Sequence, residues 1–544
     1  MLLAQSPTST LTFPDYAIIL LYLVGTIALG ILIGRKVKTG SDFFLAGRQL
    51  PWWAIGMSLV ATDIGGTDII GVGGTAYRHG LAVANFEWIG CVPAMIVGAF
   101  LFIPFLYRTG VYTVPEYLER RYNAGVRSIM AICWVIFMAC NLGVMLLASA
   151  TMMSEVFGWT PSICILVTAG LVGLYTVVGG LAAVVYTDAI QCAVMILGCL
   201  LVLVLGVIEV GGVREFQSRL AAIDSAQATS EQSTSVATDE ESRAFNHHTA
   251  LILPADTETP FPWTGIYFGL ALILSPAYWI GNQAIVQRSL GARSEFEAKA
   301  SYIWGALLKN VIPIIVALPG LVAVILIPDL SNQDAAIPTL VGTLLPVGAR
   351  GLFVAAFLAA LMSSIDSYLN SAATIVSNDF YKRFFDPQVN DKRLLSIGRI
   401  TTGVLVAWAV LFAFVLSNFE AGIYTIFQTL MAFFQGPALA VLLLGMLWKR
   451  ATGLAAVIAL LSGIGTSVSL HMLNQPIIYS KLGWEPLFKI QDPFLYLSIW
   501  AFLVSACLLV VLSLVMKPEP DEKLQYVLRA SSKKGETIPS GAVA

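Results

Sequence analysis

Apolar segments long enough to cross a lipid bilayer recur along the whole chain, and they constrain its fold more than any other feature. A helix needs about 20 predominantly apolar residues to span the hydrocarbon core. Because backbone polar groups find no water there, a spanning segment must satisfy its own hydrogen bonds as a helix. The chain is 57% hydrophobic and only 12% charged, about half the charged share of a soluble domain. We therefore expect an all-α polytopic membrane protein.

The apolar segments predict about 13 transmembrane helices. They lie near residues 15–34, 52–76, 81–107, 126–153, 161–178, 182–209, 264–286, 301–327, 348–377, 395–416, 421–446, 452–473 and 493–516.

The lysines and arginines predict how these helices are oriented. With the N-terminus outside, about 23 basic residues, Arg288 among them, fall in inner segments and about 7 in outer ones. Lys309 is left inside the membrane. An excess of basic residues marks the cytoplasmic loops of membrane proteins. We expect an external N-terminus, a cytoplasmic C-terminal tail and a multi-pass position in the plasma (inner) membrane.

Several classes of function are disfavoured by composition. The net charge of −2 gives no support to nucleic-acid binding. The seven cysteines lie in apolar segments without paired spacing, and the four histidines form no metal-binding pattern. No enzyme motif appears in the loops, so we expect no enzyme. The tail after residue 517 is too short for the signalling module of a sensor. The first apolar run is not preceded by the basic region typical of a signal peptide, so we expect no cleaved signal peptide.

Two of the predicted helices carry residues that interrupt a helix. The second contains ATDIGGTDIIGVGG, with Asp63 and Asp68 among the glycines, and the seventh contains Ser275-Pro276 in mid-span. Helices broken at matching places in two halves point to a transporter built from an inverted repeat, with its binding site at the breaks. Two ordinary kinks from close packing are the alternative.

The segment Ala355–Asp379 combines an apolar helix with hydroxyl groups and a carboxylate, Asp366. Its residues Ala360, Ser363, Ser364 and Ser367 share one helix face. Small residues on one face can line a tight helix contact, and hydroxyls there can also replace the water around a small cation.

Several long motifs resemble the solute:sodium symporter family and, within it, the sodium/glucose cotransporters. They are GVYTVPEYLERRY (110–122), GGLAAVVYTDAIQ (179–191), YWIGNQAIVQRSL (278–290), ALLKNVIPIIVALPG (306–320), MSSIDSYLNSAAT (362–374) and LLLGMLWKR (442–450). The resemblance implies a LeuT-type core of five plus five inverted-repeat helices, formed by the second to eleventh spans.

This resemblance divides the chain as follows. Residues 1–51 hold an extra helix and a loop, 52–210 the first repeat, 211–263 an external loop, 264–450 the second repeat, 451–516 two peripheral helices and 517–544 the cytoplasmic tail. The external loop is rich in Ser, Thr and acidic residues, and we expect it to be poorly ordered.

The family's main sodium site corresponds here to five residues, with carbonyls from the first three and hydroxyls from the last two. They are Ala61, Ile64, Ala360, Ser363 and Ser364. Unwound carbonyls and hydroxyls suit a hard cation.

A second cation site found in some relatives would use Asp188, Ser363, Asp366 and Ser367. Position 366 usually carries a hydroxyl in those relatives, so the two carboxylates here would bind a cation more tightly or share a proton. The alternative for Asp366 is a helix-end residue bonded to a lysine or a backbone amide.

The resemblance also implies a substrate site at the midplane. Glu87, Lys309 and Gln428 would bond to sugar hydroxyls, and Tyr278 and Trp279 would supply rings. Glu87 and Lys309 could instead pair only with each other. Three further candidates depart from relatives: Asp63 and Asp68 replace neutral residues, and Ser275 replaces an asparagine.

We therefore expect a sodium-coupled secondary active symporter that imports a glucose- or galactose-like sugar or a polyol by alternating access. An amino acid, an amine or another small organic solute is the alternative substrate. The expected partners are this solute, Na⁺ and the lipid bilayer, with no cofactor besides the coupling ion.

Overall fold

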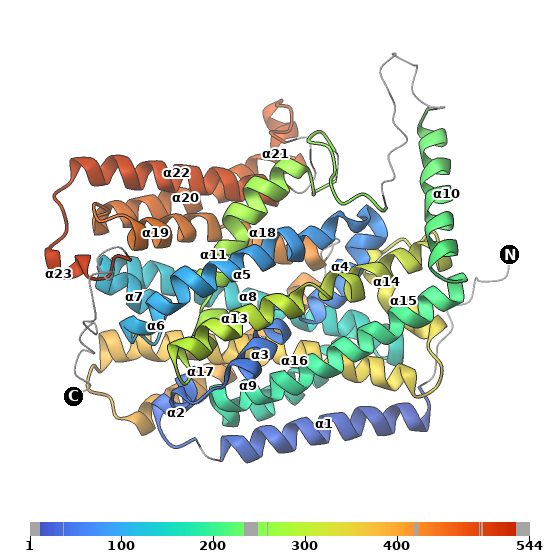
Figure 1. The fold of residues 1–544 in the computed structure, drawn as a ribbon, viewed down its shortest axis with the longest axis horizontal. Coiled ribbons are helices and arrows are strands. Elements are labelled where there is room, and N and C mark those ends of the chain that lie inside the picture. The colour runs from blue at the N-terminus through green and yellow to red at the C-terminus, as the bar shows by residue number, and fades with distance from the viewer. Residues whose placement is uncertain are drawn as a thin grey trace.

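The computed structural model describes residues 11–528 except 36, 233–247, 258, 418–422, 489 and 491–492. Each predicted apolar segment overlaps a helix, and the described residues form no β-strand. The long helices run roughly parallel in one bundle, with α10 (Val213–Gln232) at one end and α7 (Val114–Arg121) and α23 (Asp521–Leu524) at the other (Figure 1).

In these residues, nine continuous segments are long and apolar enough to cross a membrane. They are Phe13–Gly34 (α1), Leu81–Thr109 (η2 to α6), Ala124–Phe157 (α8), Gly180–Val210 (the second part of α9), Glu295–Leu326 (α13 and α14), Ala349–Phe385 (α16 and η7), Asp391–Leu416 (α17), Gly453–Leu473 (α20) and Phe494–Val515 (α22).

Three bent helix pairs pass the same test when each pair is taken as one span. They are α3 (Trp52–Asp63) with α4 (Gly66–His79), η5 and α11 (Gly265–Gly281) with α12 (Gln283–Leu290), and α18 (Ile423–Ala432) with α19 (Gln435–Leu447), bent by 55°, 49° and 41°.

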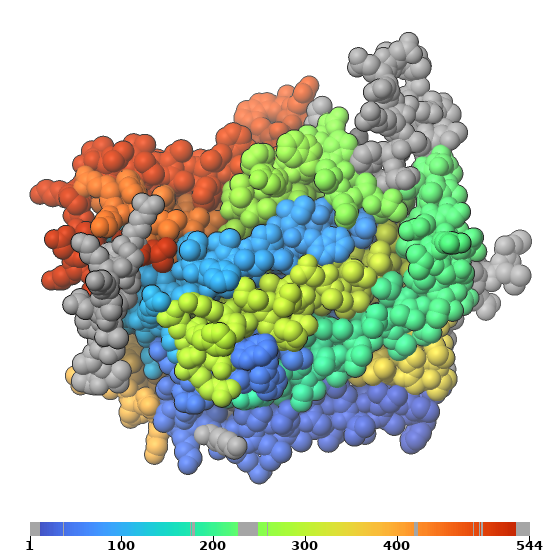
Figure 2. Space-filling view, in the orientation of Figure 1, coloured from blue at the N-terminus to red at the C-terminus, as the bar shows by residue number. Residues whose placement is uncertain are grey.

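The bundle is organised around α16 (Ala349–Ile375), whose most apolar stretch is 94% buried. It packs against α1, α3, α8, α9 and α17. By contrast, α1 is only 22% buried over its apolar stretch and lies along the outside of the bundle (Figure 1). Figure 2 shows α1, α9 and α13 (Glu295–Lys309) running across one face of the molecule. Large apolar side chains on the outer helices, such as Leu21 and Phe100, are exposed where lipid would cover them.

The first predicted break is confirmed at the residues that the sequence indicated. Helix α3 ends at Asp63, and Ile64 (φ −94°, ψ 87°) leaves the helical conformation. Helix α4 then begins after Gly65, whose N–H bonds to the Asp68 carboxylate at 2.9 Å. A carboxylate in the first turn favours a new helix start because it accepts free N–H groups.

The second break lies seven residues beyond the predicted Ser275, at Asn282. Residues Gly265–Leu274 form a π-helix that continues through Pro276 into α11, so that Gly265–Gly281 is one helical segment. Asn282 is extended (φ −69°, ψ 120°), and its side chain accepts the Ala284 N–H at 2.9 Å to start α12. The position of this prediction was therefore wrong, because an asparagine cap ends the helix where the proline does not. The bend between α18 and α19 was not predicted.

Two further features separate the spans. Helix α9 (Pro161–Val210) is continuous except at Gly180, which has φ +63°; a Cβ there would lie 2.9 Å from the Phe43 ring. The predicted spans 161–178 and 182–209 are therefore joined by a kink and not by a loop. In the predicted poorly ordered loop the structure instead places helix α10, and residues 233–247 lie outside the described part.

Ion pairs join elements at the end of the bundle that holds α7. Arg127 of α8 bonds to Asp379 of η7 at 2.7 Å and to Glu119 of α7 at 2.5 Å, and Arg383 also bonds to Glu119 at 2.7 Å. Burial raises the pKa of Glu119, but hydrogen bonds from the two guanidinium groups outweigh it and lower that pKa. These bonds fasten the α7 loop to the end of the central helix.

Close packing of α4 on α14 (Ile312–Leu326) gives a test of the fold. A Cβ added at Gly320 would lie 2.1 Å from the Gly73 carbonyl oxygen. We expect Gly320→Ala to destabilise the protein by about 1–3 kcal/mol, measured as a lower melting temperature in detergent. Gly403→Ala is the matched control, because nothing lies within 4 Å of its added methyl group. Equal melting temperatures for the two variants would contradict this packing.

Candidate functional site

Oxygen atoms from the first break and from α16 converge at one place. The Ser363 hydroxyl donates to the Ala61 carbonyl at 2.6 Å and lies 2.9 Å from the Ala360 carbonyl. The Ser364 hydroxyl donates to the Thr62 carbonyl at 3.0 Å and lies 3.2 Å from the Ala360 carbonyl. All of these residues are buried. The set is made only of carbonyl and hydroxyl oxygens, which fits a monovalent hard cation.

Ile64, the fifth residue of the predicted main sodium site, lies at the break itself. The neighbouring backbone touches α16 closely, since a Cβ at Gly65 would lie 2.7 Å from the Ser364 hydroxyl oxygen. The structure thus brings the residues implied for this site together on two elements, α3–α4 and α16.

The residues predicted for a second cation site surround an arginine. The Asp188 carboxylate accepts the Ser58 hydroxyl at 2.6 Å and lies 3.4 Å from the Arg288 guanidinium. Arg288 also donates to the hydroxyls of Ser58, at 2.7 Å, and Ser367. The sequence analysis placed Arg288 among the basic residues of the inner, cytoplasmic segments. In the structure Arg288 is completely buried, with its guanidinium between Asp188 and Ser367.

Asp366 and Ser363 lie at the edge of this group. The Ser367 hydroxyl lies 3.3 Å from the Asp366 carboxylate, and it also bonds to the Ser363 carbonyl. Asp366 is fully buried in the middle of α16, so the alternative of a residue at the helix end does not describe its position.

A cavity lies on the other side of the first break. The cavity volume is about 50 Å³, smaller than the usual range for small-molecule sites of about 300–1,000 Å³. Seven of the eight predicted substrate residues line it: Asp63, Asp68, Glu87, Ser275, Tyr278, Trp279 and Gln428. They come from α3, α4, η3 (Phe86–Cys91), α11 and α18, and therefore from both halves of the chain.

Lys309, the eighth residue, is completely buried behind this wall. Its ammonium forms ion pairs with the carboxylates of Asp63 and, at 2.6 Å, Glu87. It also lies 5.7 Å from the centre of the Trp279 ring. Lys309 therefore holds two carboxylates of the cavity wall in place from behind. A cation–π contact with the Trp279 ring further stabilises the position of its ammonium.

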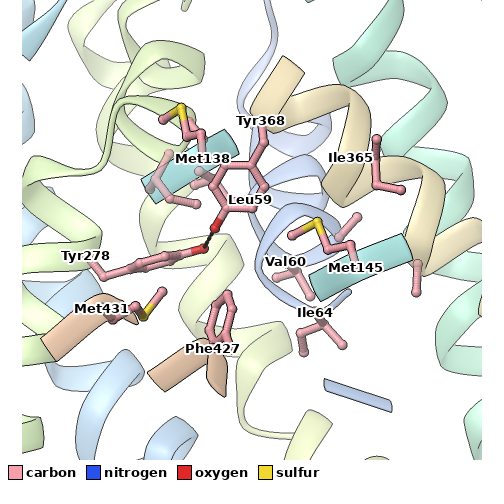
Figure 3. Close-up of a cluster of buried hydrophobic side chains, with 14 of the residues drawn as sticks. Leu59, Val60, Ile64, Met138, Met145, Tyr278, Ile365, Tyr368, Phe427 and Met431 are labelled. Atoms are coloured by element: carbon pink, nitrogen blue, oxygen red, sulfur yellow. Dashed lines mark hydrogen bonds between the residues drawn. The ribbon is translucent and has the colours of Figure 1, made fainter. Parts of the chain in front are cut away.

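Aromatic and apolar side chains also line the cavity, among them Tyr278, Phe427 and Met431. The hydroxyl groups of Tyr278 and Tyr368 point toward one another, 3.4 Å apart, with Phe427 and Met431 beside them (Figure 3). Tyr278 comes from α11 and Tyr368 from α16. The contact between these two tyrosines thus joins the second broken helix to the helix that carries Ser363.

Some residues of the wall were not predicted. Tyr424 and Gln435 line the cavity, Gln435 at the start of α19 beyond the unpredicted bend. Both amide atoms of Gln435 are buried without a hydrogen-bond partner in the described residues. The signal in the sequence was Gln435-Gly436-Pro437, a polar residue followed by two helix breakers inside an apolar span.

Helix α18, which carries Gln428, is held at its start by a residue outside the spans. The buried Asp334 carboxylate accepts the Ile423 N–H at 3.0 Å. Burial raises the pKa of Asp334 to about 6, and the bond from Ile423 limits the rise.

Residues 43–463 match the model of the sodium:solute symporter family. The chain belongs to this family. It is 32% identical over 493 residues to the sodium/glucose cotransporter of Vibrio parahaemolyticus, covering 85% of this chain and 86% of that protein. It is 30% identical to the human sodium/myo-inositol cotransporter, covering 94% of this chain and 74% of that protein.

The fold is that of sodium-coupled symporters with the LeuT-type architecture. A sodium-coupled sialic acid symporter, solved in a substrate-bound outward-open state, superimposes with a TM-score of 0.75 at 21% identity, covering 93% of this chain and 99% of that chain. A nucleobase-cation symporter superimposes with a TM-score of 0.53. The family symporter is thus a multi-pass membrane protein whose family and fold are those of secondary transporters, with sodium as the coupling ion.

The role of Lys309 can be tested by a pair of substitutions. Lys309→Gln would leave Asp63 and Glu87 as unpaired, largely buried carboxylates. Losing one partner of a buried ion pair costs about 3–5 kcal/mol, and we expect the lower part of this range because both carboxylates are partly exposed. The measurement is the melting temperature of the purified protein.

The double variant Asp63→Asn with Lys309→Gln removes one charge of each sign, and we expect it to recover part of the lost stability. A double variant that melts below Lys309→Gln would show that the Asp63 contact does not stabilise the protein.

Proposed function

We propose that this chain is a sodium-driven importer of a sugar or polyol in the plasma membrane. The observation that carries the proposal is the position of the cavity. It lies directly beside the break whose carbonyls meet Ser363 and Ser364, so a cation and a solute would share the backbone between Ala61 and Asp63.

The cation would act first on the geometry of the break. Sodium held by the carbonyls of Ala61, Ile64 and Ala360 and the hydroxyls of Ser363 and Ser364 would join the two elements that meet there. Because Asp63 and Asp68 flank the same break, this would also set the cavity wall. A cation that binds one conformation more tightly than the other shifts the population toward it. Solute would then bind to the completed cavity, and loss of sodium on the inner side would release it.

The cavity has the groups that a polyhydroxylated solute requires. Glu87 and Gln428 can bond to hydroxyls, and the Tyr278 ring can cover an apolar face of the solute. The chain's relatives named for glucose and myo-inositol support this class. An amino acid, an amine or another small organic solute remains the second candidate, favoured by the two aspartates at the break.

Membrane potential supplies the driving force. One charge moved through 100 mV is worth about 2.3 kcal/mol, which corresponds to roughly 50-fold accumulation of solute. Two charges would give about 4.6 kcal/mol, or more than roughly a thousandfold.

The proposal is tested by uptake into proteoliposomes. A panel of labelled sugars, polyols and amino acids is offered with an inward sodium gradient, and with potassium in place of sodium. We expect uptake of a sugar or polyol that depends on sodium. Uptake that ignores sodium, or sodium-dependent uptake of amino acids alone, would contradict the proposal.

The main sodium site predicts a specific loss in Ser364→Ala. One of five oxygen ligands is removed, and we expect the sodium concentration for half-maximal uptake to rise about tenfold, or about 1.4 kcal/mol. Ser371→Ala is the control. It also removes a buried serine hydroxyl from α16, and the Ser371 hydroxyl has no hydrogen-bond partner in the described residues. Equal shifts in both variants would contradict the assignment.

We also propose a second cation site formed by Asp188, Ser363, Asp366 and Ser367, which a cation would reach when Arg288 moves away. Flux measurements should then give two cations per solute, and Asp366→Ser should change that ratio or the affinity of the second cation. A ratio of one sodium per solute, unchanged in Asp366→Ser, would rule this site out.

A further inference from the structure

The walls of the cavity carry more negative than positive charge. Asp63, Asp68 and Glu87 line it, and Lys309 pairs with the first and the last of them from behind. The Lys309 side chain is completely buried, so its ammonium interacts with these two carboxylates and does not face the cavity. In the described part of the wall, no lysine or arginine lines the cavity itself.

The coupling ion reduces this excess without removing it. A sodium ion at the carbonyls of Ala61 and Ile64 would lie within two residues of Asp63 along the chain. Three carboxylates, one ammonium and one sodium ion leave a single negative charge. An unbalanced charge at membrane depth is costly, so the bound state requires one more positive charge or a proton.

Of the three carboxylates on the cavity wall, Asp68 is the one that forms no ion pair with Lys309 in the described residues. It accepts the Gly65 N–H at 2.9 Å, and the Thr67 hydroxyl lies 3.3 Å away. Its position on the cavity wall faces the same space as Tyr424 and Gln428.

A neutral side chain with unused hydrogen-bonding capacity lines the same cavity. Both amide atoms of Gln435 are fully buried and have no hydrogen-bond partner in the described residues. Buried polar groups are nearly always hydrogen-bonded, so the Gln435 amide has the capacity to bond to a solute or a water in the cavity. An amide that can both donate and accept suits a hydroxyl group.

We propose that the solute is a polyhydroxylated molecule with one protonated amine, such as an amino sugar, whose ammonium binds Asp68. Its hydroxyls bond to Gln428 and Gln435, and its charge neutralises the cavity once sodium is bound. This inference rests on the proposed sodium-coupled import of a sugar or polyol, and it narrows the substrate to such solutes that carry one positive charge.

The test compares solutes that differ in charge. Proteoliposomes with the full-length protein take up labelled glucose under a sodium gradient, with unlabelled glucosamine, glucose or N-acetylglucosamine as competitor. At pH 6.5, where the amine is protonated, we expect glucosamine to compete at least tenfold better than glucose. N-acetylglucosamine, which has no charge, should lose this advantage.

The variant Asp68→Asn should reduce the glucosamine advantage about tenfold, since it removes the charge and keeps the shape. Asp329→Asn makes the same change at an exposed site outside the cavity, and it should keep the wild-type preference. Loss of the preference in both variants would contradict the role of Asp68.

The outcomes separate this inference from the proposed function. Sodium-dependent glucose uptake without any advantage for glucosamine would overturn the amine and leave sugar transport standing; if that uptake also rose with acidity, Asp68 would take a proton in place of the amine. Absence of sodium-dependent uptake for every sugar and amino sugar would overturn both proposals.

Discussion

The contact between the broken helix α3–α4 and the central helix α16 is the constraint on which the rest of the structure depends. A break at membrane depth leaves backbone carbonyls without their helical partners, and lipid cannot satisfy them. Here the hydroxyls of Ser363 and Ser364 donate to the carbonyls of Ala61 and Thr62. The same oxygens form the set that suits sodium. In the proposed sodium site, satisfaction of the break and ion binding would use one group of atoms, which would link the ion to the position of the break.

Buried charge forms a second level of organisation around this contact. On the cavity side Lys309 holds Asp63 and Glu87, and on the opposite side Arg288 lies beside Asp188. Each basic side chain comes from the second half of the chain and each carboxylate from the first. Such pairs contribute little net stability against an apolar core, but they fix how the two halves meet. The cavity lies at this junction, so its shape depends on both halves.

Many elements were predictable from local patterns, and the exceptions have physical reasons. The break between Asp63 and Asp68 was found because clustered glycines and acids are rare inside an apolar span. The second break was predicted at the wrong residue because proline commonly breaks a helix. In the structure the helical segment continues from the π-helix through Pro276 and ends at Asn282. The bend of 41° before Gln435 was missed because the apolar residues on both sides of Gln435-Gly436-Pro437 make one span of ordinary length, although these three residues mark the bend.

The sequence by itself determined the membrane-spanning helices and the family, and it predicted the residues of the main sodium site, because hydrophobic length and long motifs are local properties of the chain. Only the tertiary structure decided which charges meet. Lys309 is far in sequence from Asp63, and Arg288 read as a charge of a cytoplasmic loop until packing buried it beside Asp188. Ion pairs between distant segments depend on how the helices pack, and no local pattern encodes that.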